Sequence, residues 1–297
     1  MTGQKAPRPR AATSKRAVVM LMNSINTNVS AMLALQALNA VNRELLTVQN
    51  RISTGKRIAS AKDNPAIWAI AQNMRGDSRA LDAVQASLQR GQSAVDVAMI
   101  AGESISDTLN QMKELVVAAT DTSLTAESRA AINQQYLSLR KQIDRIANGA
   151  EFGGVNLLSS GSQGAVKALA NAKGTDFIDV AHVDLTTGGT ALSGLPADLA
   201  GAVGDAEVAA INAGIGAVNG AIGILGTGAK ALDRHLTFIS KMQDTIDASV
   251  GRLVDADLAK ESARLQALQV RQQLAIQALA IANRQPSLLL QLFQRAA

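Results

Sequence analysis

Apolar residues recur three and four positions apart near both ends of this chain. Alternating steps of three and four keep one face of a helix apolar and favour packing against another helix. Because a lone helix with such a face is only marginally stable in water, we expect the two ends to be helices that need partners. The residues expected to form this pairing are Ile25, Val29, Met32, Leu35, Leu38, Val41, Leu45, Val48 and Ile52 near the N-terminus, and Ala267, Val270, Leu274, Ala278 and Ile281 near the C-terminus.

Helical patterns also fill much of the chain between these ends. Ser24 or Asn26 can cap a first helix that runs to about Ile52. The segment 53–65 contains Gly, Pro and turn-forming residues, and we expect it to be an extended, partly irregular connector. Helix is expected to resume after Pro65, which suits the first position of a helix.

The helix that resumes after Pro65 is expected to continue to about Ala119, and one further helix is expected before residue 150. Apolar residues follow steps of three and four from Val95 to Ala119, and again from residue 132 to residue 146. A break is expected at residues 121–125, and Asn148-Gly149 is a plausible end for the second of these helices.

The middle of the chain has a different character. Residues 150–207 are richer in Gly and Thr, and residues 177–185 alternate weakly like a strand, so we expect a small β-hairpin region or a loose loop. Helical steps return from Val208 to Leu253 despite interior glycines, each of which costs up to about 1 kcal/mol relative to Ala. Such a helix needs neighbours, and missing side chains can allow a close backbone approach at Gly214, Gly216, Gly220, Gly223 and Gly226.

The predicted fold class is therefore mainly α. We expect long antiparallel helices and a terminal coiled coil that form a rod, with a small β-hairpin or loop region in the middle of the chain. Aromatic residues make up only 2% of the 297 residues, which suits long helices packed side by side through Ala, Leu, Ile and Val.

Charge and cysteine content exclude several classes of function. The formal charge of +5 comes from five basic residues within residues 1–22, and the remaining chain has 24 basic and 24 acidic residues. No basic nucleic-acid surface is therefore expected on the body of the protein. The absence of Cys excludes disulfides, thiol catalysis and cysteine metal sites. No run of about 18 apolar residues occurs, so no membrane span is expected.

Side chains that could carry chemistry have simpler explanations. His182 and His235 lack the paired spacing of a metal site, and we expect the first to face solvent and the second to lie at a surface or interface. Asp255, Asp257 and Glu261 are typical of a helix start, where acids favour the positive end of the dipole. Gly153-Gly154 is expected to form a turn. No catalytic, cofactor-binding or metal-binding residue is predicted, and no cofactor or enzymatic activity is expected.

Several separated motifs, in the same order along the chain, closely resemble the signatures of bacterial flagellins. The N-terminal motifs are SINTNVSAMLALQALN at 24–39 and ISTGKRIASAKDNPAIWAIAQNM at 52–74, continued by LNQMKELVVAATD at 109–121 and IDRIANGAEFGGVNLL at 143–158. The C-terminal motif spans 251–293. Together they cover nearly all of residues 23–160 and 208–293, which makes the resemblance highly specific.

The resemblance implies a structural subunit that self-assembles into the extracellular bacterial flagellar filament for swimming motility. It implies export through the flagellar type III channel, and as partners other copies of the chain, the export apparatus, an export chaperone, the filament cap and the hook-junction proteins. The implied organisation is an inner coiled-coil domain (23–65 and 251–297), a helical shell domain (66–160 and 208–250) and a short variable surface region (161–207). Residues 1–22 are expected to be a disordered basic extension, explained by a misassigned start at Met20 or Met22, a tag or a real basic arm.

One segment departs from the family pattern. Flagellins recognised by an innate immune receptor often carry Arg two residues before a basic position, and Gln111 stands there, before Lys113 and the matching Glu114 and Leu115. This departure weakens the expectation of receptor recognition. Two alternatives remain open from the sequence, which are a junction protein between hook and filament and a surface-displayed binding module that uses residues 160–207.

Overall fold

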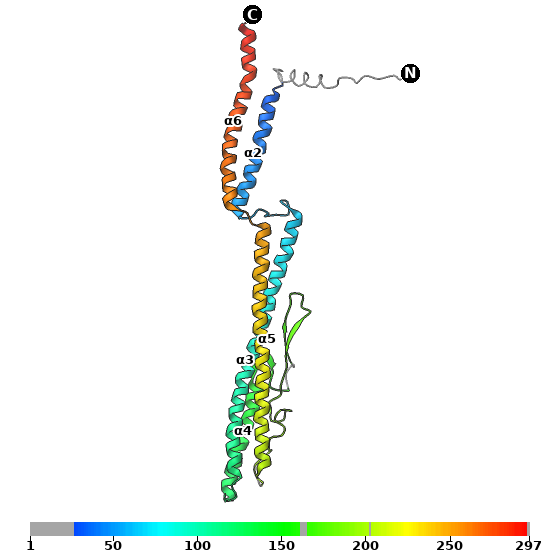
Figure 1. Ribbon diagram of the computed structural model, residues 1–297, viewed down its shortest axis with the longest axis vertical. Coiled ribbons are helices and arrows are strands. Elements are labelled where there is room, and N and C mark those ends of the chain that lie inside the picture. Colours follow the sequence, from blue (N-terminus) through cyan, green and yellow to red (C-terminus); the bar gives the residue numbers. More distant parts are fainter. Residues whose placement is uncertain (1–26, 161–164, 202, 296–297) are drawn as a thin grey trace, which may run out of the picture. The chain divides into compact units, whose positions relative to one another are not determined.

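The computed structural model describes residues 27–160, 165–201 and 203–295, so the predicted extension 1–22 and the residues Ser24, Ile25 and Asn26 lie outside the described residues. The chain divides into two compact units. The terminal unit contains residues 1–72 and 250–297, and the helical unit contains residues 73–249. The described part of the chain has five long helices and two small two-stranded sheets, which confirms the mainly α prediction (Figure 1).

The terminal unit is built on the pairing of α2 (Val29–Thr54) with α6 (Leu258–Arg295), which lie side by side (Figure 1). The side chain of Asn28 caps α2 by accepting a hydrogen bond from the amide of Ala31 at 3.0 Å. The helix therefore begins a few residues later than its predicted caps. It ends at Gly55, whose φ of 68° is the left-handed conformation that glycine adopts most readily.

The connector after α2 is held by backbone hydrogen bonds to the segment that precedes α6. The amides of Arg57 and Ile58 both donate to the carbonyl of Val254, and the amide of Ala256 donates to the carbonyl of Gly55 at 2.9 Å. Ile58 is buried. The predicted irregular connector is thus confirmed, and it is fixed by pairing with its C-terminal counterpart.

The connector ends in a tight turn and a helix cap. The carboxylate of Asp63 accepts hydrogen bonds from the amides of Ala59 and Ser60 and from the Ser60 hydroxyl. These bonds, above all the one from the Ser60 amide, hold the pKa of Asp63 below its ordinary value of 3.8. Asn64 then caps α3 (Pro65–Ala119), with Pro65 at the first helical position as predicted.

The helical unit packs α3 and α4 (Ala126–Gly149) with α5 (Asp205–Val254). Contacts between α3 and α5 run antiparallel, because Ser78 bonds to Asp247 and Ser106 bonds to Asn219. The predicted break before α4 is confirmed, and Thr125 caps that helix. The largest fully buried side chains come from α3, α4 and the middle segment, and they include Leu88, Ile105, Leu109, Met112, Tyr136, Ile143, Leu157, Leu185 and Leu192.

Two short hairpins follow α4. In the first, β1 (Glu151–Phe152) pairs with β2 (Val155–Asn156) across Gly153-Gly154, whose φ values of 59° and 85° confirm the predicted turn. In the second, β3 (Val166–Leu169) pairs antiparallel with β4 (Phe177–Val180). The predicted strand at 177–185 is therefore shorter than expected and ends at residue 180.

The second hairpin packs closely on the long helices. A Cβ added at Gly91 on α3 would lie 3.2 Å from Val166 Cγ1, and one at Gly228 on α5 would lie 2.8 Å from Val180 Cγ1. The His235 ring nitrogen Nε2 lies 2.7 Å from the carbonyl oxygen of Ala170, just beyond β3. Glycine at positions 91 and 228 is therefore what lets the hairpin reach the helices.

Residues 181–201 form an ordered cover over the helices rather than a loose loop. Leu185, Leu192, Leu195 and Leu199 are buried in the core of the helical unit. Polar bonds fasten the cover to α4, because the Tyr136 hydroxyl donates to the carbonyl of Pro196 at 2.7 Å, and Asp144, Asn133 and Arg140 also bond to it. The prediction of a loose loop was therefore wrong for these residues. Their leucines are seven, three and four residues apart, which suits a helix, but Gly188, Gly189, Gly194 and Pro196 interrupt that pattern.

The glycines of α5 differ from expectation. Leu195 and Leu192 approach Gly214 within 3.1 and 3.3 Å of an added Cβ. The other four predicted positions, Gly216, Gly220, Gly223 and Gly226, would find no atom within 4 Å. The expected close backbone approach is thus wrong for these four positions within one copy of the chain.

In the described part of the chain, α5 alone is long and apolar enough to cross a membrane by length and composition. The prediction that no span exists relied on the lack of an unbroken apolar run, whereas this helix gains its hydropathy from Ala, Ile, Val and Leu residues spread between polar ones. Ile211, Val218 and Leu225 of α5 are fully buried in the core of the helical unit. The apolar composition of α5 is thus used to build the core of a helical bundle.

Candidate assembly surface

The α2–α6 pair has a regular antiparallel seam. Asn28 donates to the carbonyl of Ala282 at 2.8 Å, and Gln272 donates to the side chain of Asn42 at 2.8 Å. As residue numbers increase along α2, the numbers of their partners on α6 decrease, so the two helices are antiparallel. The residues buried or half-buried at this seam are Ala31, Ala34, Leu38, Val41, Leu45, Val48 and Ile52 on α2, and Leu265, Leu268, Gln272, Ala275, Leu279 and Ala282 on α6.

The predicted pairing set is divided by this seam. On α2, Leu38, Val41, Leu45, Val48 and Ile52 lie in it as expected, but Met32 and Leu35 are exposed. The reason is geometric. An α-helix has 3.6 residues per turn, so four successive steps of three, from Val29 to Val41, shift the predicted residues progressively around the helix and off a single face. Ala31 and Ala34 occupy the seam instead.

On α6 the predicted face is not the one that meets α2. Ala267, Val270, Leu274, Ala278 and Ile281 are all exposed, and the seam is made by residues one or two positions further along. Apolar residues lie on more than one face of α6, so periodicity alone could not decide which face meets α2. As a pairing within one chain, this half of the prediction was wrong.

The α2–α6 pair therefore leaves several large apolar side chains exposed to solvent. Met32, Leu35, Val270, Leu274 and Ile281 are each between 48% and 65% exposed. Leu33, Leu46 and Ile276 on the same helices are also exposed. Val270, Leu274 and Ile281 share one face of α6, because they are four and seven residues apart. Exposed apolar residues gathered on one face mark interaction surfaces.

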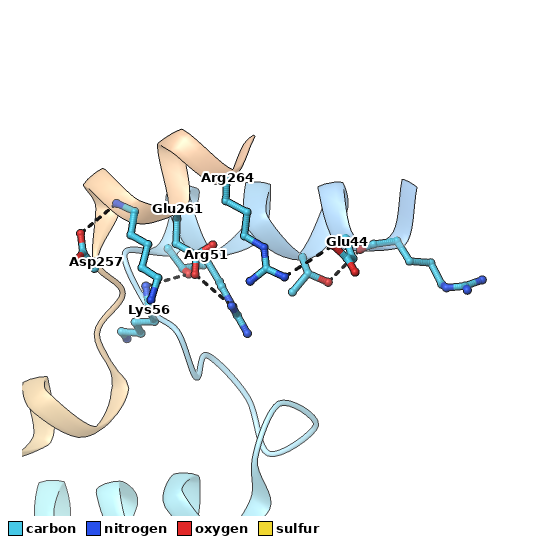
Figure 2. A network of polar contacts seen from close by, with 10 residues as sticks. Glu44, Arg51, Lys56, Asp257, Glu261 and Arg264 are labelled. Carbon is cyan, nitrogen blue, oxygen red and sulfur yellow. Dashed lines mark hydrogen bonds and ion pairs between the residues drawn. The ribbon is translucent and has the colours of Figure 1, made fainter. Parts of the chain in front are cut away.

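Polar contacts border the seam at the end where α2 finishes and α6 begins (Figure 2). Arg51 Nη1 lies 3.1 Å from Glu261 Oε1, and Arg264 Nη2 lies 3.6 Å from Glu44 Oε2. The second carboxylate oxygen of Glu261, Oε2, is buried without a hydrogen-bond partner among the described residues. Glu261 lies in the first turn of α6, as the sequence predicted for a helix start. It also joins the two terminal helices through its ion pair with Arg51.

A shallow groove of about 310 Å³ lies beside these ion pairs. Its wall combines guanidinium groups with small and apolar side chains, and it is lined by Ala40, Arg43, Glu44, Thr47, Val48, Arg51 and Arg264. We call it the basic groove. The sequence did not indicate it, because it depends on the register that brings Arg264 opposite Glu44.

The segment that resembles a receptor-binding stretch lies on α3. Lys113 and Glu114 line a shallow hollow of about 510 Å³ together with Asn110, Val117 and Ala118. Gln111 is exposed, whereas Leu115 packs against the core. The four predicted residues therefore do not share one surface.

The two histidines are held by backbone contacts. His182 Nε2 lies 2.9 Å from the carbonyl oxygen of Ser159, and the ring is half-buried rather than facing solvent as expected. His235 anchors the second hairpin, as described above. Within residues 27–160, 165–201 and 203–295 no group of three or more His, Asp or Glu side chains could hold a metal ion.

Comparison with known proteins points to one family. Residues 25–163 match the family model for the bacterial flagellin N-terminal helical region, and residues 208–293 match that for the C-terminal helical region. The chain is 48% identical over 281 residues to Flagellin FljK of Caulobacter vibrioides, covering 93% of this chain and 100% of the relative. It is 38% identical over 285 residues to a flagellin of Brucella melitensis, covering 92% and 100%.

Among solved structures, a putative flagellar hook-associated protein from Vibrio parahaemolyticus has a similar fold. The TM-score is 0.54 at 18% identity, and the match covers 65% of this chain and 100% of the other. A likeness at this identity concerns the fold alone.

Proposed function

This chain belongs to the bacterial flagellin family and is a structural subunit of the flagellar filament, and we propose that the apolar faces left open by its α2–α6 pair are buried between neighbouring copies. Flagellins form the extracellular filament that drives swimming. What this proposal adds is which residues of this chain make the contact.

The observation that carries the proposal is the exposure of Met32 and Leu35 on α2 and of Val270, Leu274 and Ile281 on α6. Each large apolar side chain removed from water contributes roughly 1.5–3 kcal/mol. A head-to-tail contact whose rotation does not close repeats without limit and gives a helical filament. Burial of this surface therefore provides the driving force, and a contact of this open kind provides the repeat that a filament needs.

Seeded polymerisation of the purified full chain tests the proposal. The variant Val270→Ser with Leu274→Ser is expected to keep the helicity of the monomer but to lose growth on wild-type seeds. Gln269→Ser with Gln273→Ser is the matched control, because these exposed residues adjoin the first pair on the same helix. Electron microscopy of filament length is the readout, and equal growth of the two variants would contradict the proposal.

We further expect the terminal helices to gain order on assembly. An amphipathic helix whose apolar face has no cover is marginal in water, so the ends of the monomer should fray and become helical in the filament. Circular dichroism before and after polymerisation measures this change, and the absence of any gain in helicity would argue against it.

The division of roles along the chain is also part of the proposal. Residues 23–65 and 251–297 would form the inner coiled coil, residues 66–160 and 208–250 the surrounding shell, and residues 161–207 a short surface region. The boundaries between the terminal unit and the helical unit, at residues 72–73 and 249–250, lie inside α3 and α5. Limited proteolysis of assembled filaments tests these roles, since the inner segments should be protected and any cleavage should fall within 161–207.

From family membership we propose that the chain is exported through the flagellar type III channel. We also propose that it binds an export chaperone, the filament cap and the hook-junction proteins. The test is secretion of the chain by a motile host with and without a working export apparatus, and intracellular retention in both cases would speak against this route. The alternative of a hook–filament junction protein is less well supported, because the full-length relatives reported above are named flagellins. No observation on the receptor-like segment favours receptor recognition.

A further inference from the structure

The charge of this chain is divided between its two units. Beyond residue 22, the sequence of the terminal unit has 11 basic and 5 acidic residues, whereas the helical unit has 13 basic and 19 acidic residues. The balance seen beyond residue 22 therefore conceals a basic terminal unit and an acidic helical unit.

The acids of the paired terminal helices are already neutralised. Along α2 and α6 the only acidic residues are Glu44 and Glu261, and each has an Arg partner across the pair. Arg43, which lines the basic groove, makes no ion pair within the described part of the chain. The groove thus keeps an excess of positive charge on a surface that is partly apolar.

The helical unit carries a complementary stripe on α3. Asp96, Glu103, Asp107 and Glu114 are exposed, and they are separated by seven, four and seven residues, so they share one face of the helix. No basic residue occurs from position 91 to position 112, and none of the four carboxylates makes an ion pair among the described residues. Glu103 and Asp107 lie one turn apart and repel each other. We call these four residues the acidic stripe.

Resting on the proposed filament function, we infer that the basic groove of one copy binds the acidic stripe of another copy. Identical terminal units placed side by side in a filament repel each other unless an opposite charge lies between them. The helical unit supplies that charge, since it holds 19 of the 24 acidic residues of the chain. A second copy is therefore the partner that this groove fits.

Arg43 is the guanidinium of the groove that can pair with a second copy, because Arg51 and Arg264 already bond to Glu261 and Glu44. Exposed Ile100, four residues after Asp96 on the same face, offers an apolar contact for the wall of the groove at Ala40 and Val48.

Zero-length cross-linking of assembled filaments tests this contact. The variant Arg43→Lys keeps the charge and introduces an amine that a carbodiimide joins to a touching carboxylate. Filaments grown from equal amounts of 15N-labelled and unlabelled copies then show by mass spectrometry whether a cross-link joins two copies. We expect mixed-label cross-links from position 43 to the peptides that carry Asp96, Glu103, Asp107 or Glu114, with wild-type filaments as the background.

Cross-links from position 43 that reach only Glu44, or only residues 250–297, would overturn the inference, and so would intact filaments with no cross-link at position 43. Failure of the wild-type chain to polymerise would instead count against the proposed function.

Neutralisation of the stripe gives a second, independent test. Glu103→Gln with Asp107→Asn should slow seeded growth several-fold at low salt and weaken its dependence on salt concentration. Asp233→Asn with Asp244→Asn removes the same charge from exposed positions on α5 and should change neither. Equal effects of the two pairs would show that net charge alone matters and would overturn the inference.

Discussion

Two glycines on one helix are expected to respond oppositely to the same substitution. A Cβ at Gly228 would lie 2.8 Å from Val180 Cγ1 and 3.0 Å from Val180 Cγ2, well inside the 3.5–4.0 Å of a normal carbon contact. Val180 is 2% exposed, so it cannot turn away without moving β4. A Cβ at Gly220 would meet no atom within 4 Å.

The expected magnitudes follow from these surroundings. Replacing Gly with Ala inside a helix gains up to about 1 kcal/mol, and Gly220→Ala should realise this gain. Gly228→Ala has the same gain but also the cost of overpacking, about 1–3 kcal/mol. The two variants should therefore differ by about 1–3 kcal/mol in the free energy of unfolding of the helical unit.

Thermal unfolding of the monomer measures this difference. Tyr136, the single tyrosine of the chain, is fully buried in the helical unit, so its near-ultraviolet signal reports on that unit. For a unit of this size, each kcal/mol shifts the melting temperature by about 2–4 °C. We expect a rise for Gly220→Ala and a melting temperature below that variant for Gly228→Ala. If Gly228→Ala is as stabilising as Gly220→Ala, the close packing of the second hairpin on α5 is refuted.

Three further predictions concern single side chains. Burial raises the pKa of Tyr136 from 10.0 to about 12. The unfolded chain therefore loses this proton first, and the free energy of unfolding should fall as the pH rises from about 10 to about 12. Tyr136→Phe should reduce that fall in alkaline unfolding experiments. The lowered pKa of Asp63 means that its ionised form favours the connector turn at neutral pH and stops doing so as acid protonates it; the amide shift of Ser60 followed by NMR should titrate below pH 3.8. Asp144 accepts two hydrogen bonds from Thr187, so Asp144→Ala should destabilise the helical unit by about 1–3 kcal/mol in the same thermal assay, and an unchanged melting temperature would contradict this.

Periodicity predicted the helices well because the pattern and the packing obey the same geometry. The series from Val95 to Ala119 holds one face without a slip, and Val95, Ile105, Leu109 and Met112 are all fully buried. The preferences of individual residues likewise predicted a helix start at Pro65 and a turn at Gly153-Gly154 correctly, because proline and glycine constrain the local backbone directly.

The errors arise where the partner surface decides the outcome. Val270 and Leu274 make as good a stripe as Leu265 and Leu268, and only the register against α2 selects the second pair. The buried leucines of residues 181–201 have a helical spacing, but glycines and Pro196 interrupt it, so the segment forms an irregular cover instead of a helix. The basic groove depends on the register between α2 and α6, which brings Arg264 beside Arg43 and Arg51. A sequence pattern could not reveal it, because that register is set only by packing.

The central claim is that apolar residues exposed on the terminal helices become buried between copies, and Met32 allows the most direct measurement of it. Met32 is 63% exposed, whereas Met112 is fully buried in the helical unit and serves as the internal control. Peroxide oxidation followed by mass spectrometry gives the rate at each methionine in monomers and in filaments. The account predicts rapid oxidation of Met32 in the monomer and strong protection in the filament, with Met112 protected in both. Equal oxidation rates at Met32 in the two states would contradict it.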